Sequence, residues 1–133
     1  MLNPFPDLLA FGLVAPLLLR VAVGLMFVNA GIKKLCRKSW VISLFERLNL
    51  KPASSYAVAF GVVEVVSGFL LVVGLFTQIA SLATLVVSVF MLYEKNKRPA
   101  EMPGSRGVFL LLCIISLSLL FSGAGFLAFD VPL

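Results

Sequence analysis

The stretch LLAFGLVAPLLLRVAVGLMFVNAGI, residues 8–32, decides the class of this protein. It contains a single charged residue, Arg20, and about 20 mostly apolar residues suffice for a helix to cross a bilayer. No lysine or arginine precedes Arg20, the apolar run is long, and no small-residue cleavage site follows it. We therefore expect a transmembrane helix that stays in the mature protein, not a signal peptide.

The composition of the whole chain agrees with a membrane protein. Of the 133 residues, 61% are hydrophobic and 13% are charged. In a soluble domain roughly half of the residues are hydrophobic and about a quarter are charged. The mean hydropathy of +1.11 excludes a soluble domain, because a short chain has too little interior to bury so many apolar side chains. The same apolar excess excludes intrinsic disorder.

Three further apolar runs follow the first. Within a single transmembrane domain over residues 1–133, the predicted spans are about 8–33, 56–76, 79–93 and 108–128. Only Thr77 and Gln78 separate the second span from the third, which is short, and this spacing predicts a tight helical hairpin. The run lengths fit helices better than the strands of a membrane barrel. The predicted fold is an all-α integral membrane four-helix bundle.

The basic residues are concentrated in two of the predicted loops. Six of the eleven lysines and arginines lie between the first two spans, and four lie between the last two. The positive-inside rule then predicts a cell (inner or plasma) membrane protein with both basic loops in the cytoplasm and both termini outside. Because this topology and anionic lipid headgroups account for the net charge of +5, we expect the lipid bilayer as a partner and no nucleic acid.

The first basic loop has a helical periodicity of its own. Between residues 39 and 48, apolar side chains recur at helical spacing: Trp40, Val41, Leu44, Phe45 and Leu48. The pattern predicts a short interfacial amphipathic helix between the first two spans, with Trp40 and Phe45 as anchors. Docking to a partner protein is the alternative interpretation of the same face.

Two charged residues lie inside the predicted spans, Arg20 in the first and Glu64 in the second. Counted from the cytoplasmic ends of their spans, Arg20 lies roughly 20 Å and Glu64 roughly 15 Å into the membrane. An isolated charge at the membrane centre costs about 2.5 to 3.5 kcal/mol on the insertion scale. We therefore expect an Arg20–Glu64 pair, direct or bridged by water, and the sequence leaves open whether this pair links the helices or forms a ligand or proton site.

Glycines accompany these charges at intervals suited to helix packing. Gly24 and Gly31 lie in the first span, and Gly68 and Gly74 lie in the second. Small residues allow membrane helices to approach closely. We predict that these four glycines pack helices against one another.

Residue content also excludes several kinds of catalytic centre. The chain has no histidine, and its two cysteines, Cys36 and Cys113, form no C-x-x-C pair. Haem ligation by imidazole, histidine zinc sites and Ser-His-Asp catalysis all need residues that the chain lacks. We expect no metal site and no intrinsic cofactor, and we do not expect the chain to be catalytic by itself.

Three segments, taken in order, resemble the DoxX family. The first, RVAVGLMFVNAGIKKL at residues 20–35, has Arg20, Gly24, Phe27, Gly31, Lys34 and Leu35 at the family's positions. The segment EVVSGFLLVVGLFTQIA at residues 64–80 is similar to its Glu-x-x-x-Gly and Gly-Leu-x-Thr pattern, and FSGAGFLAFD at residues 121–130 is similar to its Gly-x-Gly ending with a later Asp. Two residues depart from the pattern, since Asn29 and Gln78 stand where many members carry histidine and arginine.

The resemblance implies a four-helix membrane bundle and leaves more than one class of function open. In the first class, the chain is a small subunit or accessory of a membrane redox complex, with a quinone or small anion near Arg20 and Glu64. In the second, it is a non-catalytic assembly or scaffold protein that binds another membrane protein; a transporter built as a homo-oligomer is the third. A pocket open to lipid at these charges would favour the first class, and a closed pair between helices would favour the second.

Overall fold

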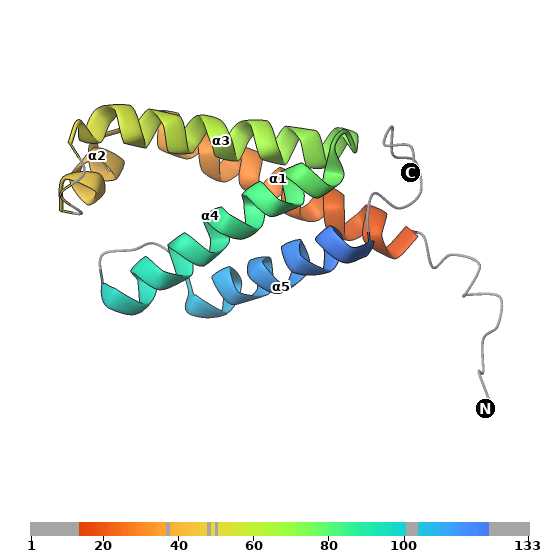
Figure 1. The fold of residues 1–133 in the computed structure, drawn as a ribbon. Helices are drawn as coiled ribbons and strands as arrows, with labels where there is room; N and C mark the ends of the chain where they lie inside the picture. The colour runs from red at the N-terminus through yellow and green to blue at the C-terminus, as the bar shows by residue number, and fades with distance from the viewer. Residues whose placement is uncertain (1–13, 37, 48, 50, 101–103, 123–133) are drawn as a thin grey trace.

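The computed structural model describes residues 14–36, 38–47, 49, 51–100 and 104–122. Within these ranges the chain forms five helices and no strand, which confirms the all-α prediction. The helices are α1 (Val14–Cys36), α2 (Lys38–Arg47), α3 (Ala53–Val73), α4 (Thr77–Lys97) and α5 (Arg106–Ser122) (Figure 1). The predicted beginning of the first span at residues 8–13 and the predicted end of the last at 123–128 lie outside the described residues.

Three of the helices, α1, α3 and α4, are long and apolar enough to cross a membrane. Helix α4 has 21 residues and continues beyond the predicted span of 79–93. It runs on through Glu94 and Lys97 because backbone hydrogen bonding, not side-chain hydropathy, determines where a helix ends. The apolar helix α5 has 17 residues.

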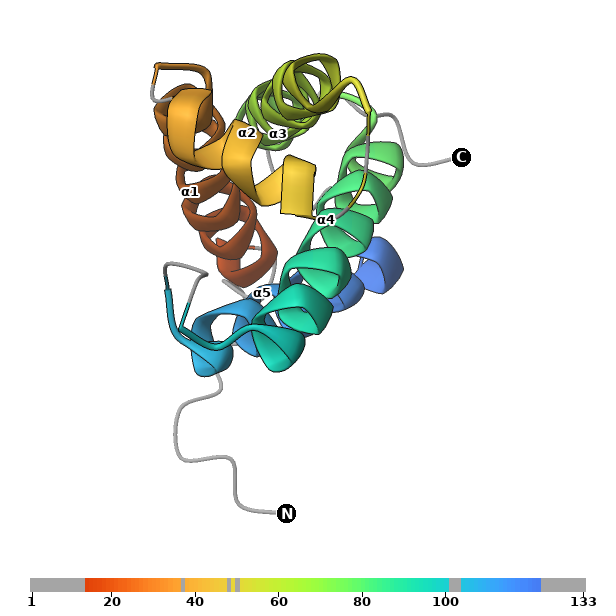
Figure 2. The same cartoon turned by 90° about the vertical axis from the view of Figure 1, so that its left-hand side faces the viewer.

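The long helices are arranged as two antiparallel pairs, α1 with α3 and α4 with α5, as Figure 1 shows. The tight turn at residues 74–76 joins α3 to α4. Figure 2 shows α2 lying across one end of the bundle. At this end the Arg98 guanidinium donates a hydrogen bond to the backbone carbonyl of Arg47 (3.2 Å), so the two basic segments lie together.

Helix α2 packs its apolar face against α3. Val41 and Phe45 form a buried cluster with Ala53 and Ala57. Phe45 is 4% exposed, and its ring meets Phe60 edge-on at a centroid distance of 5.8 Å. The predicted interfacial anchor Phe45 is thus covered by protein, because an amphipathic face can be buried by a neighbouring helix as well as by lipid. The side chain of Trp40, the other predicted anchor, lies outside the described part of the chain.

Glycines form the contact between α1 and α3. A Cβ atom built on Gly24 would lie 2.7 Å from the backbone oxygen of Gly68, and one built on Gly68 would lie 2.7 Å from that of Gly24. A Cβ atom built on Gly31 would lie 2.8 Å from the backbone oxygen of Gly61. The two helices touch backbone to backbone at these points, and their antiparallel register follows from the two contacts.

Gly74 has a different role from the other predicted packing glycines. It is the C-cap of α3 in the left-handed conformation (φ 80°, ψ 31°), and its N–H donates to the carbonyl of Leu70 at 2.8 Å. A residue with a Cβ atom is disfavoured in this conformation. Gly74 therefore ends α3 and begins the turn to α4.

Candidate functional site

A buried ion pair joins α1 to α3. The Lys34 ammonium donates a hydrogen bond to Oε1 of Glu64, and the two side chains are only 9% and 3% exposed. The Lys34 ammonium also lies 4.8 Å from the ring centroid of Phe60, which adds a cation–π attraction. One carboxylate and one aromatic ring thus hold the lysine on the α3 side of the bundle.

Arg20, which the sequence analysis pairs with Glu64, lies elsewhere. Its guanidinium lies beside Gly74, where an added Cβ atom would be 2.7 Å from Nη1. Gly74 follows Glu64 by ten residues on α3, or roughly 15 Å along the helix axis. The side chain that pairs with Glu64 is therefore Lys34, whereas Arg20 lies at the C-terminal end of α3, whose partial negative charge favours a cation.

The offset of α1 along α3 explains why Lys34, and not Arg20, pairs with Glu64. The depth estimate treats Lys33 and Ser54 as level, but Gly31 lies opposite Gly61, so Lys33 lies more than one turn deeper than Ser54. Helical side chains also lean toward the N-terminus of their helix. The Arg20 side chain therefore leans away from Glu64, and the long Lys34 side chain leans toward it.

Sequence reasoning missed Lys34 because this residue was counted with the basic loop. A signal was present in the spacing, since five residues of α1 alternate four and three apart and are all buried: Arg20, Gly24, Phe27, Gly31 and Lys34. On α3 the same alternation includes Ala57, Gly61, Glu64, Gly68 and Leu71. Two such stripes packed together place Lys34 on the buried face of α1 rather than in the loop.

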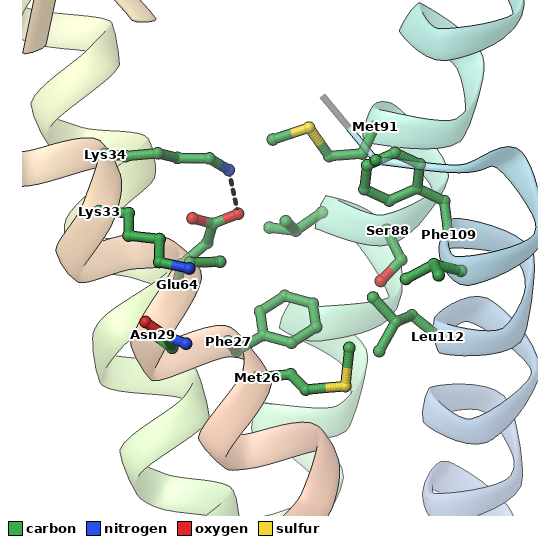
Figure 3. Close-up of a pocket in the computed structure, with 14 residues that line it drawn as sticks. Met26, Phe27, Asn29, Lys33, Lys34, Glu64, Ser88, Met91, Phe109 and Leu112 are labelled. Carbon is green, nitrogen blue, oxygen red and sulfur yellow. Dashed lines mark hydrogen bonds and ion pairs between the residues drawn. The ribbon is translucent and has the colours of Figure 1, made fainter. Parts of the chain in front are cut away.

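A cavity of about 400 Å³ lies beside the ion pair, between the two helix pairs (Figure 3). The side chains that line it come from four helices: Met26, Phe27, Asn29, Ala30, Lys33, Lys34, Glu64, Val87, Ser88, Met91, Val108, Phe109 and Leu112. Of these, Met26 is 47% and Val108 is 40% exposed, so the cavity reaches the surface between α1 and α5. Because Met26 lies about 10 Å along α1 from Lys33, this opening extends along the side of the bundle.

Two buried polar atoms of the cavity residues have no hydrogen-bond partner among the described residues. One is Oε2 of Glu64, the carboxylate oxygen that Lys34 does not engage, and the other is Oγ of Ser88 on α4. Glu64 and Ser88 are 2% and 1% exposed. Buried polar groups normally have partners. In Figure 3 the Glu64 oxygen on the Ser88 side of the carboxylate is the one bonded to Lys34, and Ser88 lies across the cavity from it.

The buried face of α4 carries further hydroxyl groups outside the cavity. Thr84 donates to the backbone oxygen of Ser81 at 3.0 Å and makes a hydrogen bond with the Ser116 hydroxyl of α5 at 3.1 Å. The hydrogen bond between Thr84 and Ser116 links α4 to its neighbour α5. Ser81 is fully buried, and its Oγ lacks a partner among the described residues.

The cavity has the features of a small-molecule site. Among the described residues, no three His, Cys, Asp or Glu side chains are grouped so that they could hold a metal ion. An apolar cavity with a few convergent polar groups is typical of a small-molecule site. The candidate site therefore consists of Glu64, Lys34 and Ser88 with the apolar walls around them.

Comparisons with known proteins agree with this helical membrane architecture. The family model described as DoxX matches residues 15–93. The chain is 33% identical over 91 residues to "Uncharacterized membrane protein Rv3486" of Mycobacterium tuberculosis (strain H37Rv). That match covers 68% of this chain and 56% of the relative, so the chain spans little more than half of the relative's length. No solved structure matches the chain.

Proposed function

The chain belongs to the DoxX family of membrane proteins, and we propose that it is an accessory subunit of a quinone-linked membrane redox complex. In this role it binds the quinone head group in the cavity beside Glu64 and Lys34. It holds the ligand for a partner protein that carries the redox centre.

The observation that carries this proposal is the cavity itself. A purely structural ion pair between α1 and α3 needs no space beside it, and a scaffold role gains nothing from one. Here Glu64 and Lys34 instead form one wall of a cavity whose other lining residues are mostly apolar. Apolar walls suit the ring and tail of a lipid-soluble molecule, and the few polar groups suit its oxygen atoms.

The position of the opening supports entry from the lipid. Met26 and Val108 lie at the surface where the cavity opens between α1 and α5. In a bundle that spans the bilayer, this side faces hydrocarbon over much of its length. A ligand dissolved in the membrane then reaches Glu64 without crossing water.

The proposal includes four spans, with α5 as the fourth, and basic loops in the cytoplasm. The two basic segments lie together at one end of the bundle, where Arg98 contacts Arg47. This is the arrangement expected if the two helices between them, α3 and α4, each cross the membrane once. The positive-inside rule then assigns this end to the cytoplasm and both termini to the outside. Helix α2 lies at the same end (Figure 2), which places it at the cytoplasmic interface of the bilayer.

This orientation predicts which cysteines react in intact bacterial cells. Cys36 is exposed near the basic end, and Phe76 is exposed on the α3–α4 turn at the other end. With Cys113→Ser, a membrane-impermeant maleimide should label Cys36 only after the cells are opened. With Cys36→Ser, Cys113→Ser and Phe76→Cys together, it should label intact cells, and the reverse pattern would refute the orientation.

The binding role is tested by identifying what co-purifies with the protein in mild detergent. We expect mass spectrometry to find quinone with the wild-type protein, and an Ala30→Phe variant to retain at least about tenfold less because the new ring fills the cavity. Ala22→Phe is the matched control, since Ala22 is exposed on the same helix and should retain the wild-type amount. Absence of quinone from the wild type, or equal retention by Ala30→Phe, would refute the proposal.

A further inference from the structure

We propose that the cavity favours an anionic head group, so that it binds a quinone with an ionised hydroxyl group more tightly than a neutral quinone of similar size. This inference rests on the proposed function and names the chemical class of quinone that the same cavity takes. It follows from the charges of the lining side chains and from their position along the opening between α1 and α5.

The charged side chains that line the cavity are two lysines and one glutamate: Lys33, Lys34 and Glu64. Lys34 and Glu64 form the buried ion pair, so their charges offset each other. Lys33 is exposed on α1 and forms no ion pair with any of the residues that the structure describes. The described lining therefore carries one positive charge in excess, and a neutral ligand leaves this charge without a counter-ion.

A second buried carboxylate, that of Glu94, does not line the cavity. It lies three residues beyond Met91 on α4, beside the lysines of the last turn, Lys95 and Lys97. The ammonium of Lys97 is close enough to interact electrostatically with this carboxylate. The charge of Glu94 is therefore offset outside the cavity, and the excess positive charge of the lining remains.

The excess charge lies at one end of the cavity, and apolar side chains line the other end. Lys33 is seven residues beyond Met26 on α1, or roughly 10 Å along the helix axis. Phe109, near the beginning of α5, lies toward the Lys33 end, whereas Met26 and Leu112 lie toward the opposite end (Figure 3). The N-terminal end of α5 adds a partial positive charge at the Lys33 end. A ligand with an anionic head and an apolar tail matches this order, with its head beside Lys33 and its tail leaving beside Met26.

Asn29 gives the same wall a neutral hydrogen-bonding group. It lies four residues before Lys33 on α1, so the two side chains are neighbours on one face of the helix, and both line the cavity. The amide of Asn29 donates and accepts and can therefore meet an oxygen atom of either kind of quinone. Lys33 donates with a charge, and a charge-assisted hydrogen bond is roughly twice as strong as a neutral one. Lys33 therefore distinguishes an anionic ligand from a neutral one, whereas Asn29 does not.

The cavity is also large enough for an aromatic head group. Its volume is about 400 Å³, whereas an apolar cavity of about 150 Å³ already holds benzene. Phe27 and Met91 lie in the same lining, so a ring can pack against an aromatic side chain and a thioether. The volume therefore accommodates a ring system of naphthoquinone size.

The test compares a 2-hydroxy-3-alkyl-1,4-naphthoquinone, at a pH at which its hydroxyl group is ionised, with its neutral 2-methoxy ether. Binding to the purified full-length protein in an uncharged detergent is measured by isothermal titration calorimetry. We expect the ionised hydroxy compound to bind at least about tenfold more tightly than the ether. In Lys33→Met the ratio should fall to about one or below, because the lining then has no excess charge, whereas Lys33→Arg should keep the preference.

Lys51→Met is the matched control, because Lys51 is also an exposed lysine of the basic segments but does not line the cavity, and its ratio should equal that of the wild type. Asn29→Leu should weaken both ligands by a similar factor and leave their ratio unchanged. Failure of both ligands to bind to the wild type would refute the proposed function. Equal binding of both, a ratio that survives in Lys33→Met, or a ratio that falls as far in Lys51→Met would refute only the preference for an anionic head group.

Discussion

Replacing Lys34 by methionine is expected to lower the free energy of unfolding by about 3–5 kcal/mol, because the carboxylate of Glu64 then stays buried without its counter-ion. The measurement is reversible unfolding in mixed detergent and SDS, followed by circular dichroism. Lys33→Met is the matched control, since Lys33 is the exposed neighbour on the same helix. Its free energy of unfolding should change by no more than about 0.5 kcal/mol.

A double-mutant cycle distinguishes the two candidate partners of Glu64. Lys34→Met and Glu64→Gln together should cost clearly less than the sum of the single variants, because the double variant contains neither buried charge. Arg20→Met combined with Glu64→Gln should be additive within about 0.5 kcal/mol, since the Arg20 guanidinium lies beside Gly74 and not beside Glu64. Additivity for Lys34, or strong coupling for Arg20, would contradict the pairing described above.

Alanine in place of the interhelical glycines is expected to destabilise the protein in a graded order, measured by the same unfolding assay. Gly68→Ala should cost most, up to about 3 kcal/mol, because its new Cβ would meet backbone oxygen, backbone nitrogen and a Cβ atom at 2.7, 2.8 and 3.0 Å. Gly61→Ala should cost less, since the nearest atoms belong to the flexible side chain of Leu35 at 3.0 Å.

Gly107 in α5 provides the matched control for this series. Among the described residues, a Cβ atom there would meet only the Ser105 hydroxyl, at 3.9 Å. Gly107→Ala should therefore be neutral or stabilising by up to about 1 kcal/mol, since alanine is the better helix former. If Gly68→Ala were as stable as Gly107→Ala, the close contact between α1 and α3 would be refuted.

Hydropathy predicted the helical elements well because it is a local property. The run at residues 56–76 corresponds to most of α3 and the tight turn at 74–76, and Thr77 and Gln78, where the sequence predicted the turn, already belong to α4. Hydropathy predicted a span that ends at residue 93, whereas the helix itself continues to Lys97, because a helix can extend beyond its apolar part. Hydropathy also could not predict whether lipid or protein buries the apolar face of α2. In the structure Phe45 on this face is buried against α3.

By itself, the sequence determined that this is a helical membrane protein of the DoxX family, with charges buried among apolar helices. Composition, run length and motif order are sufficient for these conclusions, since each depends on residues close together in the chain. Only the tertiary structure decided that Lys34, and not Arg20, pairs with Glu64. That choice depends on how far α1 and α3 are shifted along each other, which is set by where their glycines allow the backbones to touch. The cavity beside the pair likewise exists only because two helix pairs meet there, with Ser88 of α4 facing Glu64 of α3.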